Sequence, residues 1–370
     1  MTSSRKILIA CGGTGGHLFP GIAVAETLLA QGHEPLLLIS QKKIDSQASA
    51  KYPHLNFKSV PAIAKPPTLS PKMLPFLWAL YQSIQTSKKI IRDFGADAVL
   101  GMGGFTSLPP VYAGHKLGKK TFVHDSNARP GRSNILTSRF CDKVFIGLQP
   151  AAAFFKKPTE LTGTPARPEI HNLPSRTEAA ARFGLDPAKP TLLVTGGSQG
   201  ALGLNQLVAN AAPLLPENIQ ILHIAGPNDL PRIQAEHPVQ RPGYQLIGFC
   251  DQMPSAYALA DLVVTRSGAS TLTEISLAGL PSILVPYPYA ADDHQTANAK
   301  VFSEVGAAKL IQQKDLTPES LAKLLTELLT NPAALKLMSS ASKSLAVPDA
   351  AEKVTAALLA ASGPPGGGQP

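Results

Sequence analysis

The stretch KILIACGGTGGHLFP, residues 6–20, decides the fold of this 370-residue chain. Residues 6–10 form a short apolar run that is typical of a buried strand, and a glycine-rich turn follows at residues 12–16. Residues 20–31 then predict a helix with proline in its first turn. A second apolar run at residues 35–39 completes the pattern strand, turn, helix, strand, which indicates the βαβ unit of a parallel sheet.

The same order of elements restarts in the second half of the chain. A strand-like run at residues 191–194 leads into a second glycine loop at residues 196–200. Residues 96–104, ADAVLGMGG, also resemble residues 260–268, ADLVVTRSG. Two similarities in the same order predict two similar α/β domains of the Rossmann type, although strand–glycine–helix units also recur by chance.

Proline and glycine cluster in residues 162–168, which predicts the join between the two domains. We expect four parts, namely an N-terminal domain at residues 1–165, a C-terminal domain at residues 166–345, a C-terminal helix at residues 346–361 and a tail at residues 362–370. The tail has too few apolar groups to pack, so we expect it to be disordered.

The formal net charge of +9 suits an anionic partner such as a nucleotide, a phospholipid or a nucleic acid, although it also serves solubility. Aromatic residues make up 6% of the chain and form no strip with basic residues, which makes a nucleic-acid binder the weakest interpretation. The apolar run at residues 7–10 is shorter than a secretion signal, and no stretch is long enough to span a membrane. The spacing of Cys11, Cys141 and Cys250 is not that of a metal site and fits a reducing cytosol.

The first glycine loop lies where a strand passes into a helix, a geometry that suits an anion or a negatively charged leaving group. It has neither the G-x-G-x-x-G spacing of a dinucleotide site nor the Lys-Ser/Thr ending of a P-loop, so both of those interpretations weaken. A tight turn without a ligand is the alternative. His17 begins the helix, where the positive end of the dipole keeps an imidazole neutral and able to act as a general base. A histidine that only caps or packs at the turn is equally consistent with the pattern.

The segment TRSGASTLTE, residues 265–274, again follows a strand and opens a helix whose free N–H groups could accept a phosphate. Glu274 could accept the hydroxyl groups of a ribose, but Thr271-x-x-Glu274 is also a capping box that needs no ligand. A polar cluster at residues 292–298 follows another strand. A metal site could be built from Asp292, Asp293 and His294. This interpretation is disfavoured because ligands adjacent in sequence rarely converge on one ion.

Several motifs together resemble the MurG family of bacterial UDP-N-acetylglucosamine transferases, and the resemblance runs in register from about residue 5 to residue 345. These motifs are GGTGGHLFP at residues 12–20, GMGGF at 101–105, GGSQGA at 196–201, RSGA at 266–269, Glu274, and DHQ at 293–295. The resemblance implies the glycosyltransferase B fold, in which two Rossmann-like domains face a cleft that holds the nucleotide sugar. It also implies transfer of N-acetylglucosamine from UDP-N-acetylglucosamine to the C4 hydroxyl of lipid I, giving lipid II for peptidoglycan, with no cofactor and no metal.

The resemblance also assigns roles by position. The residues implied to bind UDP-N-acetylglucosamine are Thr14, Gly15, Gly16, Asn127, Arg167, Ser198, Cys250, Ala269, Ser270, Thr271, Leu272, Thr273, Glu274 and Gln295. The chain departs from the family at residues 124–127, HDSN, where the middle pair is usually glutamate and glutamine. His17 is the candidate catalytic base.

The lipid acceptor implies contact with the cytoplasmic face of the inner membrane, as a peripheral protein on an anionic surface. Residues 72–92 carry apolar and aromatic side chains next to lysines, a composition that suits such a surface. The expected patch consists of Leu74, Phe76, Leu77 and Trp78. An ordinary helix packed on its own sheet is the alternative interpretation.

Two rival functions remain open on the sequence. A related transferase or an epimerase would keep the UDP-sugar cleft, and the loop at residues 101–107 would then bind another acceptor. A noncatalytic nucleotide-sugar-binding or scaffold subunit is the second rival. The presence of both His17 and Glu274 argues against it, because a pure binder needs no base.

Overall fold

A computed structural model describes residues 4–41, 50–61, 71, 73–197, 200–238 and 240–361 of the chain. It divides into two compact units. The first comprises the chain up to Arg167 together with the segment from Asp349 onward, and the second comprises Pro168–Pro348. The expected boundary between residues 165 and 166 lies two residues before this division. The predicted disorder of residues 362–370 falls outside the described residues.

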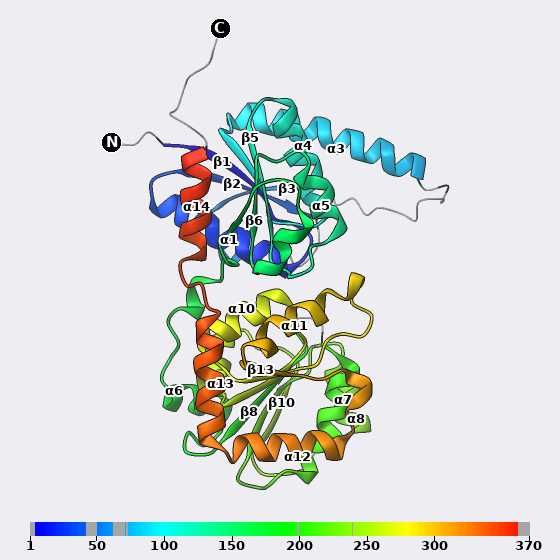
Figure 1. Ribbon diagram of the computed structural model, residues 1–370, viewed down its shortest axis with the longest axis vertical. Helices are drawn as coiled ribbons and strands as arrows, with labels where there is room; N and C mark the ends of the chain where they lie inside the picture. Colours follow the sequence, from blue (N-terminus) through cyan, green and yellow to red (C-terminus); the bar gives the residue numbers. More distant parts are fainter. Residues whose placement is uncertain are drawn as a thin grey trace. The chain divides into compact units, whose positions relative to one another are not determined.

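The first unit contains a parallel sheet in which each central strand is covered on both faces by helices (Figure 1). Within the described residues its strands run, in order across the sheet, β3 (Asn56–Val60), β2 (Glu34–Ser40), β1 (Lys6–Ala10), β4 (Ala98–Gly101), β5 (Lys120–Asp125), β6 (Lys143–Ile146) and β7 (Thr159–Leu161). Its helices are α1 (Gly15–Ala30), α3 (Met73–Phe94), α4 (Leu108–Lys116), α5 (Arg132–Ser138) and α14 (Ala350–Ala361), with short 3₁₀ turns η1 (Phe105–Ser107) and η2 (Gln149–Phe154).

The second unit repeats this architecture. Its parallel strands run, across the described part of the sheet, β10 (Tyr244–Ile247), β9 (Gln220–Ile224), β8 (Thr191–Thr195), β11 (Leu262–Thr265), β12 (Ser282–Leu284) and β13 (Ala308–Leu310). Its helices are α6 (Arg176–Phe183), α7 (Leu202–Ala211), α8 (Leu230–Glu236), α9 (Met253–Leu259), α10 (Ala269–Ala278), α11 (His294–Glu304), α12 (Pro318–Leu329) and α13 (Pro332–Ser344), with 3₁₀ turns η3 (Pro168–Ile170), η4 (Ala212–Leu214), η5 (Ala291–Asp293) and η6 (Gln313–Asp315).

The two sheets share one strand order. Counted from its own first strand, each begins 3-2-1-4-5-6, the doubly wound order of a Rossmann fold. The prediction of two similar Rossmann-type units is therefore confirmed. The second similarity found in the sequence, between residues 96–104 and 260–268, falls on β4 and β11, which hold equivalent places in the two sheets.

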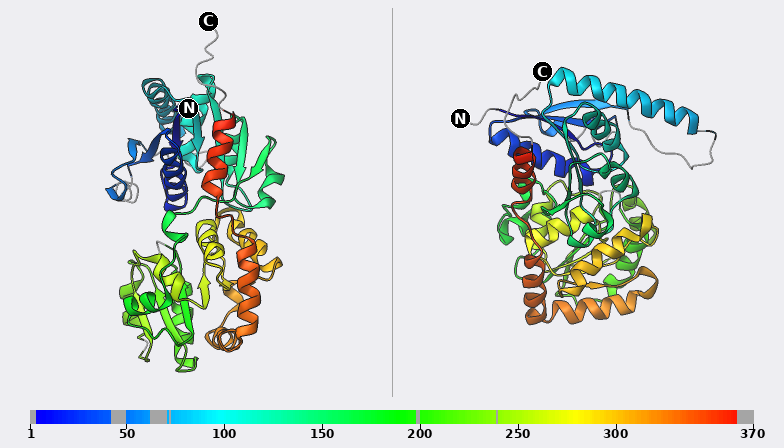
Figure 2. Two further views of the ribbon diagram at one scale, coloured as in Figure 1. Left: turned by 90° about the vertical axis from the view of Figure 1, so that its left-hand side faces the viewer. Right: turned by 45° about the horizontal axis from the view of Figure 1, so that its top comes forward.

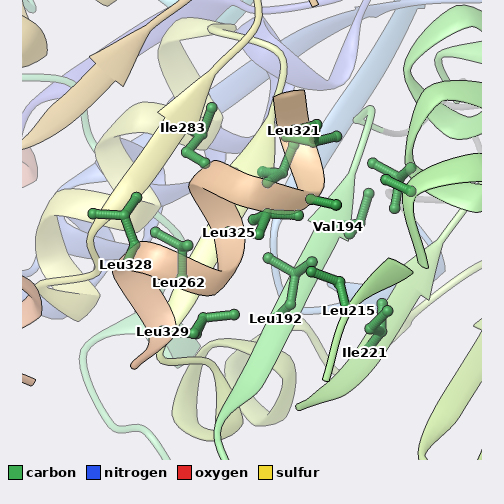
Figure 3. Packing of buried hydrophobic residues seen from close by; sticks show 14 of the residues in the cluster. Leu192, Val194, Leu215, Ile221, Leu262, Ile283, Leu321, Leu325, Leu328 and Leu329 are labelled. Carbon is green, nitrogen blue, oxygen red and sulfur yellow. The ribbon is translucent and has the colours of Figure 1, made fainter. Parts of the chain in front are cut away.

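Alternating side chains of the central strands supply two cores in each unit. In β1, Ile7 and Ile9 pack with α1 and α14 on one face, while Leu8 and Ala10 pack on the opposite face with α3 and α4. Figure 3 shows the equivalent packing in the second unit, where Leu321 and Leu325 of α12 lie over strand residues such as Leu192. Burial on both faces explains why β1 is almost entirely apolar.

Two sequence predictions are corrected or refined by the helices. The helix expected from residue 20 begins at Gly15, so Pro20 lies inside α1 and not in its first turn. The C-terminal helix is present as α14, which lies alongside α1 (Figures 1 and 2) and buries Val354 and Leu358 in the core of the first unit. The last helix therefore belongs structurally to the N-terminal half of the chain.

Candidate functional site

Each sheet reverses its strand order at its first strand, and ligands of doubly wound folds bind at the carboxyl ends of the strands at such a point. In the first unit the loops there follow β1 and β4. In the second unit they follow β8 and β11. All four of these loops contain the glycine or RSGA motifs that the sequence singled out.

The loop after β1 packs tightly against its neighbours. A Cβ on Gly12 would lie 2.3 Å from the backbone nitrogen of Ser40, so only glycine fits there. The Thr106 hydroxyl donates to the Gly12 carbonyl oxygen over 2.7 Å, and the Ser107 hydroxyl donates to the Gly103 carbonyl oxygen over 2.7 Å. Side chains of η1 therefore tie the loop after β4 to the loop after β1.

His17 lies in the first turn of α1, because the helix begins at Gly15. Its imidazole rests on the loop after β4, where a Cβ on Gly103 would lie 2.9 Å from the ring and one on Gly104 would lie 3.2 Å from it. The ring is partly exposed. Two glycines with positive φ thus make room for a histidine in the first turn of α1.

The loop after β5 is organised by Asp125, whose side chain is 2% exposed. Its Oδ1 accepts hydrogen bonds from the backbone N–H and the side-chain amide of Asn127, at 2.9 and 3.2 Å. Its Oδ2 accepts from the Asn134 amide at 2.7 Å and from the Gly131 N–H at 3.1 Å. Asp125, one of the two residues that depart from the family pattern, therefore accepts four hydrogen bonds and orients Asn127.

These contacts bring His17 and the loop after β5 into one region of the first unit. A Cβ on Gly103 would touch both His17 and the Asn134 amide nitrogen. His124, fully buried in β5, bonds through Nε2 to the Gly163 carbonyl oxygen at 2.9 Å, and burial lowers its pKa below the ordinary value. Its Nδ1 has no hydrogen-bond partner within the part of the chain that the structure describes.

Arg167 ends the first unit. Its guanidinium lies 4.9 Å from the centroid of the Phe19 ring, a cation–π contact with α1. The side chain is partly exposed. The sequence resemblance gives Arg167 a place on the nucleotide side, and the structure places it within reach of the helix that carries His17.

In the second unit, the loop after β8 lies over a buried polar network. A Cβ on Gly200 would lie 2.6 Å from Oδ2 of Asp229, which accepts from the Asn205 amide at 2.9 Å. His223 connects Asn205 Oδ1, at 3.1 Å, to the Tyr244 hydroxyl, at 2.7 Å. Burial lowers the pKa of His223 to about 4. Ser198, predicted to bind the donor, lies outside the described residues.

The predicted phosphate segment, Ala269 to Thr273, forms the first turn and a half of α10. The N-cap of this helix is Gly268, with no side-chain cap, so the alternative of a capping box built on Thr271 is wrong. The N–H of Leu272 bonds back to the Gly268 carbonyl, and the N–H groups of the three preceding residues have no acceptor within the helix. Leu272 is 1% exposed, so only its backbone can face a ligand.

Glu274 lies on the same helix, one turn further along, and is partly exposed. Its Oε2 accepts a hydrogen bond of 2.8 Å from the hydroxyl of Tyr257 on α9, which is 2% exposed. The carboxylate is therefore oriented by a neighbouring helix and not by a cap.

Gln295 is the second residue of α11 and lies close to the start of α10. The Ser267 hydroxyl donates to the Gln295 carbonyl oxygen over 2.8 Å, and the Gln295 Oε1 accepts from the Tyr287 N–H at 2.9 Å. Asp292 and Asp293, just before Gln295, have φ of 52° and 55°, a left-handed backbone that costs free energy outside glycine. The resemblance gives Gln295 a sugar-binding role, and the structure places it next to the α10 segment.

Cys250 follows β10 and is 8% exposed, packed in the apolar core of the second unit. Because this side chain is buried, only the backbone of Cys250 could face a ligand. Among the described residues, no group of three His, Cys, Asp or Glu side chains is gathered as a metal ion requires, and Asp292, Asp293 and His294 form no such group.

The face of α3 is unusually apolar for a surface helix. Leu74, Leu77, Trp78 and Tyr81 have relative exposures of 78%, 50%, 63% and 52%. Phe76 does not belong to this surface, because it is 8% exposed and its ring packs 5.5 Å from that of Phe105. An open hollow of about 700 Å³ lies along the helix, between its aromatic side chains and Pro61. No helix in the described ranges is long and apolar enough to cross a bilayer.

Sequence reasoning missed the contacts of three residues that shape these sites. Asp125 directly follows the buried run of β5, and an acidic residue in that position could have indicated the network. Tyr257 gave no such signal, and Arg266 was recognised only as part of the RSGA motif. Their contacts were missed because the partners Glu274 and Gln313 lie 17 and 47 residues away in sequence.

The chain resembles known proteins over most of its length. Residues 7–146 match the N-terminal domain of glycosyltransferase family 28, and residues 191–354 match its C-terminal domain. A protein of Citrifermentans bemidjiense, named UDP-N-acetylglucosamine–N-acetylmuramyl-(pentapeptide) pyrophosphoryl-undecaprenol N-acetylglucosamine transferase, is 37% identical over 362 residues, which cover 96% of this chain and 99% of that protein. A Neisseria gonorrhoeae protein of the same name is 37% identical over 359 residues, covering 96% and 98%.

Solved structures agree with the fold. The crystal structure of MurG from Acinetobacter baumannii superposes with a TM-score of 0.77 at 29% identity, covering 97% of this chain and all of that one. A putative UDP-N-acetylglucosamine 2-epimerase from Listeria monocytogenes superposes with a TM-score of 0.74 at 18% identity, covering 97% of each chain. The second likeness shows the shared fold alone.

Proposed function

The chain belongs to glycosyltransferase family 28, and from this premise we propose that it transfers N-acetylglucosamine from UDP-N-acetylglucosamine to the C4 hydroxyl of the muramic acid in lipid I, giving lipid II. The observation that carries the proposal is the match at 37% identity over 96% of the chain to transferases of this name. The matching glycine loops at the reversal points of both sheets support it, because they are where this fold binds nucleotide sugars.

The donor is proposed to bind the second unit. The N–H groups of residues 269–271 would hold the diphosphate at the positive end of the α10 dipole, and Glu274, oriented by Tyr257, would accept the ribose hydroxyls. Gln295 would hold the sugar. The backbone beside Cys250 would contact the uracil.

The first unit is proposed to supply the base and contacts to the sugar. Thr14, Gly15 and Gly16 would line the site at the start of α1, Asn127 would contact the N-acetyl group, and Arg167 the nucleotide. His17 accepts the proton of the C4 hydroxyl as its oxygen bonds to the anomeric carbon. The bond from that carbon to the phosphate oxygen breaks with inversion, and its electron pair leaves with UDP. Helix N-termini stabilise the charge that develops on the diphosphate.

The exposed face of α3 is proposed to rest on the membrane that carries the lipid acceptor. Leu74, Leu77 and Trp78 supply apolar and aromatic contact, and Lys88, Lys89 and Arg92 lie further along the same helix. A helix that carries both exposed aromatic side chains and cations is suited to the headgroup region of an anionic bilayer. The protein would then act as a peripheral enzyme on the cytoplasmic face of the inner membrane.

The test is a transfer assay with labelled UDP-N-acetylglucosamine and a lipid I analogue, run in the presence of a chelator. Formation of a lipid II analogue supports the proposal. Absence of transfer, with release of free sugar or formation of an epimer of the donor, would favour a related enzyme with another substrate. Failure of any uridine nucleotide to bind in calorimetry would refute both.

A further inference from the structure

Arg266 directly follows β11 and lies two residues before Gly268, the N-cap of α10. Its side chain is only 7% exposed. One guanidinium nitrogen, Nη1, donates to the carbonyl oxygens of Val285 and Pro286, both at 3.0 Å, and Nη2 donates to Oε1 of Gln313 at 2.7 Å. One side chain therefore fastens the segment after β12 and the turn η6 to the start of α10.

The charge of Arg266 has no carboxylate partner among the residues that the structure describes. No carboxylate of the described residues forms an ion pair with it, and its buried Nε has no hydrogen-bond partner there. The Tyr287 ring, 5.6 Å from the guanidinium, is its only aromatic neighbour among those residues. Although burial lowers the pKa of Arg266, an arginine starts from such a high value that it stays charged at neutral pH. A buried charge without an ion pair costs free energy, so a charged side chain at this position indicates a function that offsets the cost.

The surroundings of Arg266 are those of the proposed donor site. The next residue, Ser267, binds the carbonyl of Gln295 through its hydroxyl and receives the Asn298 amide on its own carbonyl, at 2.8 and 3.0 Å. Tyr287, under the guanidinium, donates its N–H to the Gln295 side chain. The buried cation is thus connected to both the sugar-binding candidate and the phosphate-binding turn.

We propose that Arg266 is a positioning residue of the donor site, and that its unpaired guanidinium also supplies positive potential that favours the nucleotide diphosphate over less charged ligands. This inference rests on the proposed function. When the bond to the sugar breaks, the diphosphate gains one negative charge, so a fixed cation beside its binding turn stabilises the leaving group more than the intact donor.

The test is calorimetric binding of uridine, UMP and UDP to the wild type and to the variants R266M, R266Q and R266K. Loss of the charge should weaken UDP about 10- to 100-fold, weaken UMP less and leave uridine within about twofold. R266K retains the charge and should retain the preference for UDP over uridine, while its kcat falls because an ammonium cannot hold the same three oxygens. If R266M does not fold, R266Q also lacks the charge and serves for the same comparison of uridine, UMP and UDP affinities.

The chain offers a control in Arg241, whose guanidinium donates to the backbone carbonyls of Ala212, Leu215, Pro216 and Ile219. R241M should lower stability and leave the ratio of UDP to uridine affinity unchanged. The inference would be overturned if R266M and R266Q lost affinity equally for uridine, UMP and UDP. It would also be overturned if the ratio of UDP to uridine affinity in R266K equalled the ratio in those two variants. A wild type that binds none of the three would instead refute the proposed function.

Discussion

The hydroxyl of Tyr257 on α9 donates a hydrogen bond of 2.8 Å to Oε2 of Glu274 on α10. Tyr257 is 2% exposed, so phenylalanine would fill the same space without the hydroxyl. We expect Tyr257→Phe to raise KM for UDP-N-acetylglucosamine about 5- to 10-fold with little change in kcat, as loss of one hydrogen bond worth about 1 kcal/mol implies. Steady-state kinetics check this, with Tyr112→Phe as control. An unchanged KM would show that Glu274 needs no such support.

Asp125 receives four hydrogen bonds from the loop and the helix that follow it, two of them from Asn127. Asp125→Asn replaces one acceptor oxygen by a donor that faces other donors. We expect it to lower the free energy of unfolding by about 1–3 kcal/mol and to reduce transfer activity. Asp125→Glu retains the acceptors and should be less harmful. Denaturant unfolding and the transfer assay measure both effects, and equal behaviour of the two variants would contradict the role of the network.

His17 is proposed as the base that accepts the proton of the attacking hydroxyl. His17→Ala should lower kcat about 10²- to 10⁴-fold, the range expected for loss of general base catalysis. UDP binding, measured by calorimetry, should hardly change, because the phosphate-binding turn lies in the second unit. His17→Gln is the control for packing, since it refills part of the space over Gly103 and Gly104. A normal kcat in His17→Ala would remove His17 from the mechanism.

The stability of the second unit should fall in acid because His223 is buried as the neutral form. Its pKa is about 4 in the folded protein and near 6.5 when unfolded, so the unfolded chain binds the proton first. The contribution of neutral His223 to the free energy of unfolding is fully present above about pH 6.5. It is lost as the pH falls toward 4, by about 3 kcal/mol in total. Denaturant unfolding from pH 7 to pH 4 should show this slope, and His223→Gln should flatten it.

His124 adds a loss of the same sign in the first unit, since burial also lowers its pKa. A His223→Gln variant with the slope of the wild type would show that other groups govern the acid transition. The partners Tyr244 and Asn205 stay in place in that variant, so the comparison isolates the proton bound by the imidazole.

Membrane contact through α3 should be lost when its apolar face is made polar. Leu77→Ser with Trp78→Ser should abolish flotation with vesicles that contain phosphatidylglycerol, while the wild type floats and binds less as salt rises. Leu214→Ser is a matched control, because Leu214 is 53% exposed on the second unit. Equal flotation of the double variant and the wild type would contradict the proposed surface, and so would absence of wild-type binding.

Most of the fold could be predicted from local patterns. Short apolar runs bounded by glycine marked β1, β4, β8 and β11, because strands covered on both faces show almost continuous apolar sequence. The start of α1 was misplaced, since helix signals favour proline in the first turn, whereas the tight turn lets Gly15 and Gly16 enter the helix before Pro20. That shift decides the environment of His17.

The site was predictable where it depends on backbone geometry, and not where it depends on long-range contacts. The glycine loops and the first turn of α10 follow from sequence. The hydrogen bond from Tyr257, the contacts of Arg266 and the burial of Phe76 against Phe105 do not, because each partner comes from a different element. Apolar side chains of α3 cannot be sorted into inner and outer ones by composition alone.

The polypeptide passes between the two units twice, at Arg167–Pro168 and at Pro348–Asp349, and α14 returns to the first unit. A single proteolytic nick at the first crossing would leave a carboxyl-terminal fragment that still carries α14, with Val354 and Leu358 fully buried beside α1. The nicked molecule would therefore run as one particle in gel filtration and separate only in denaturant. For the same reason, a gene fragment that stops at residue 167 would produce an N-terminal half with part of its interior exposed.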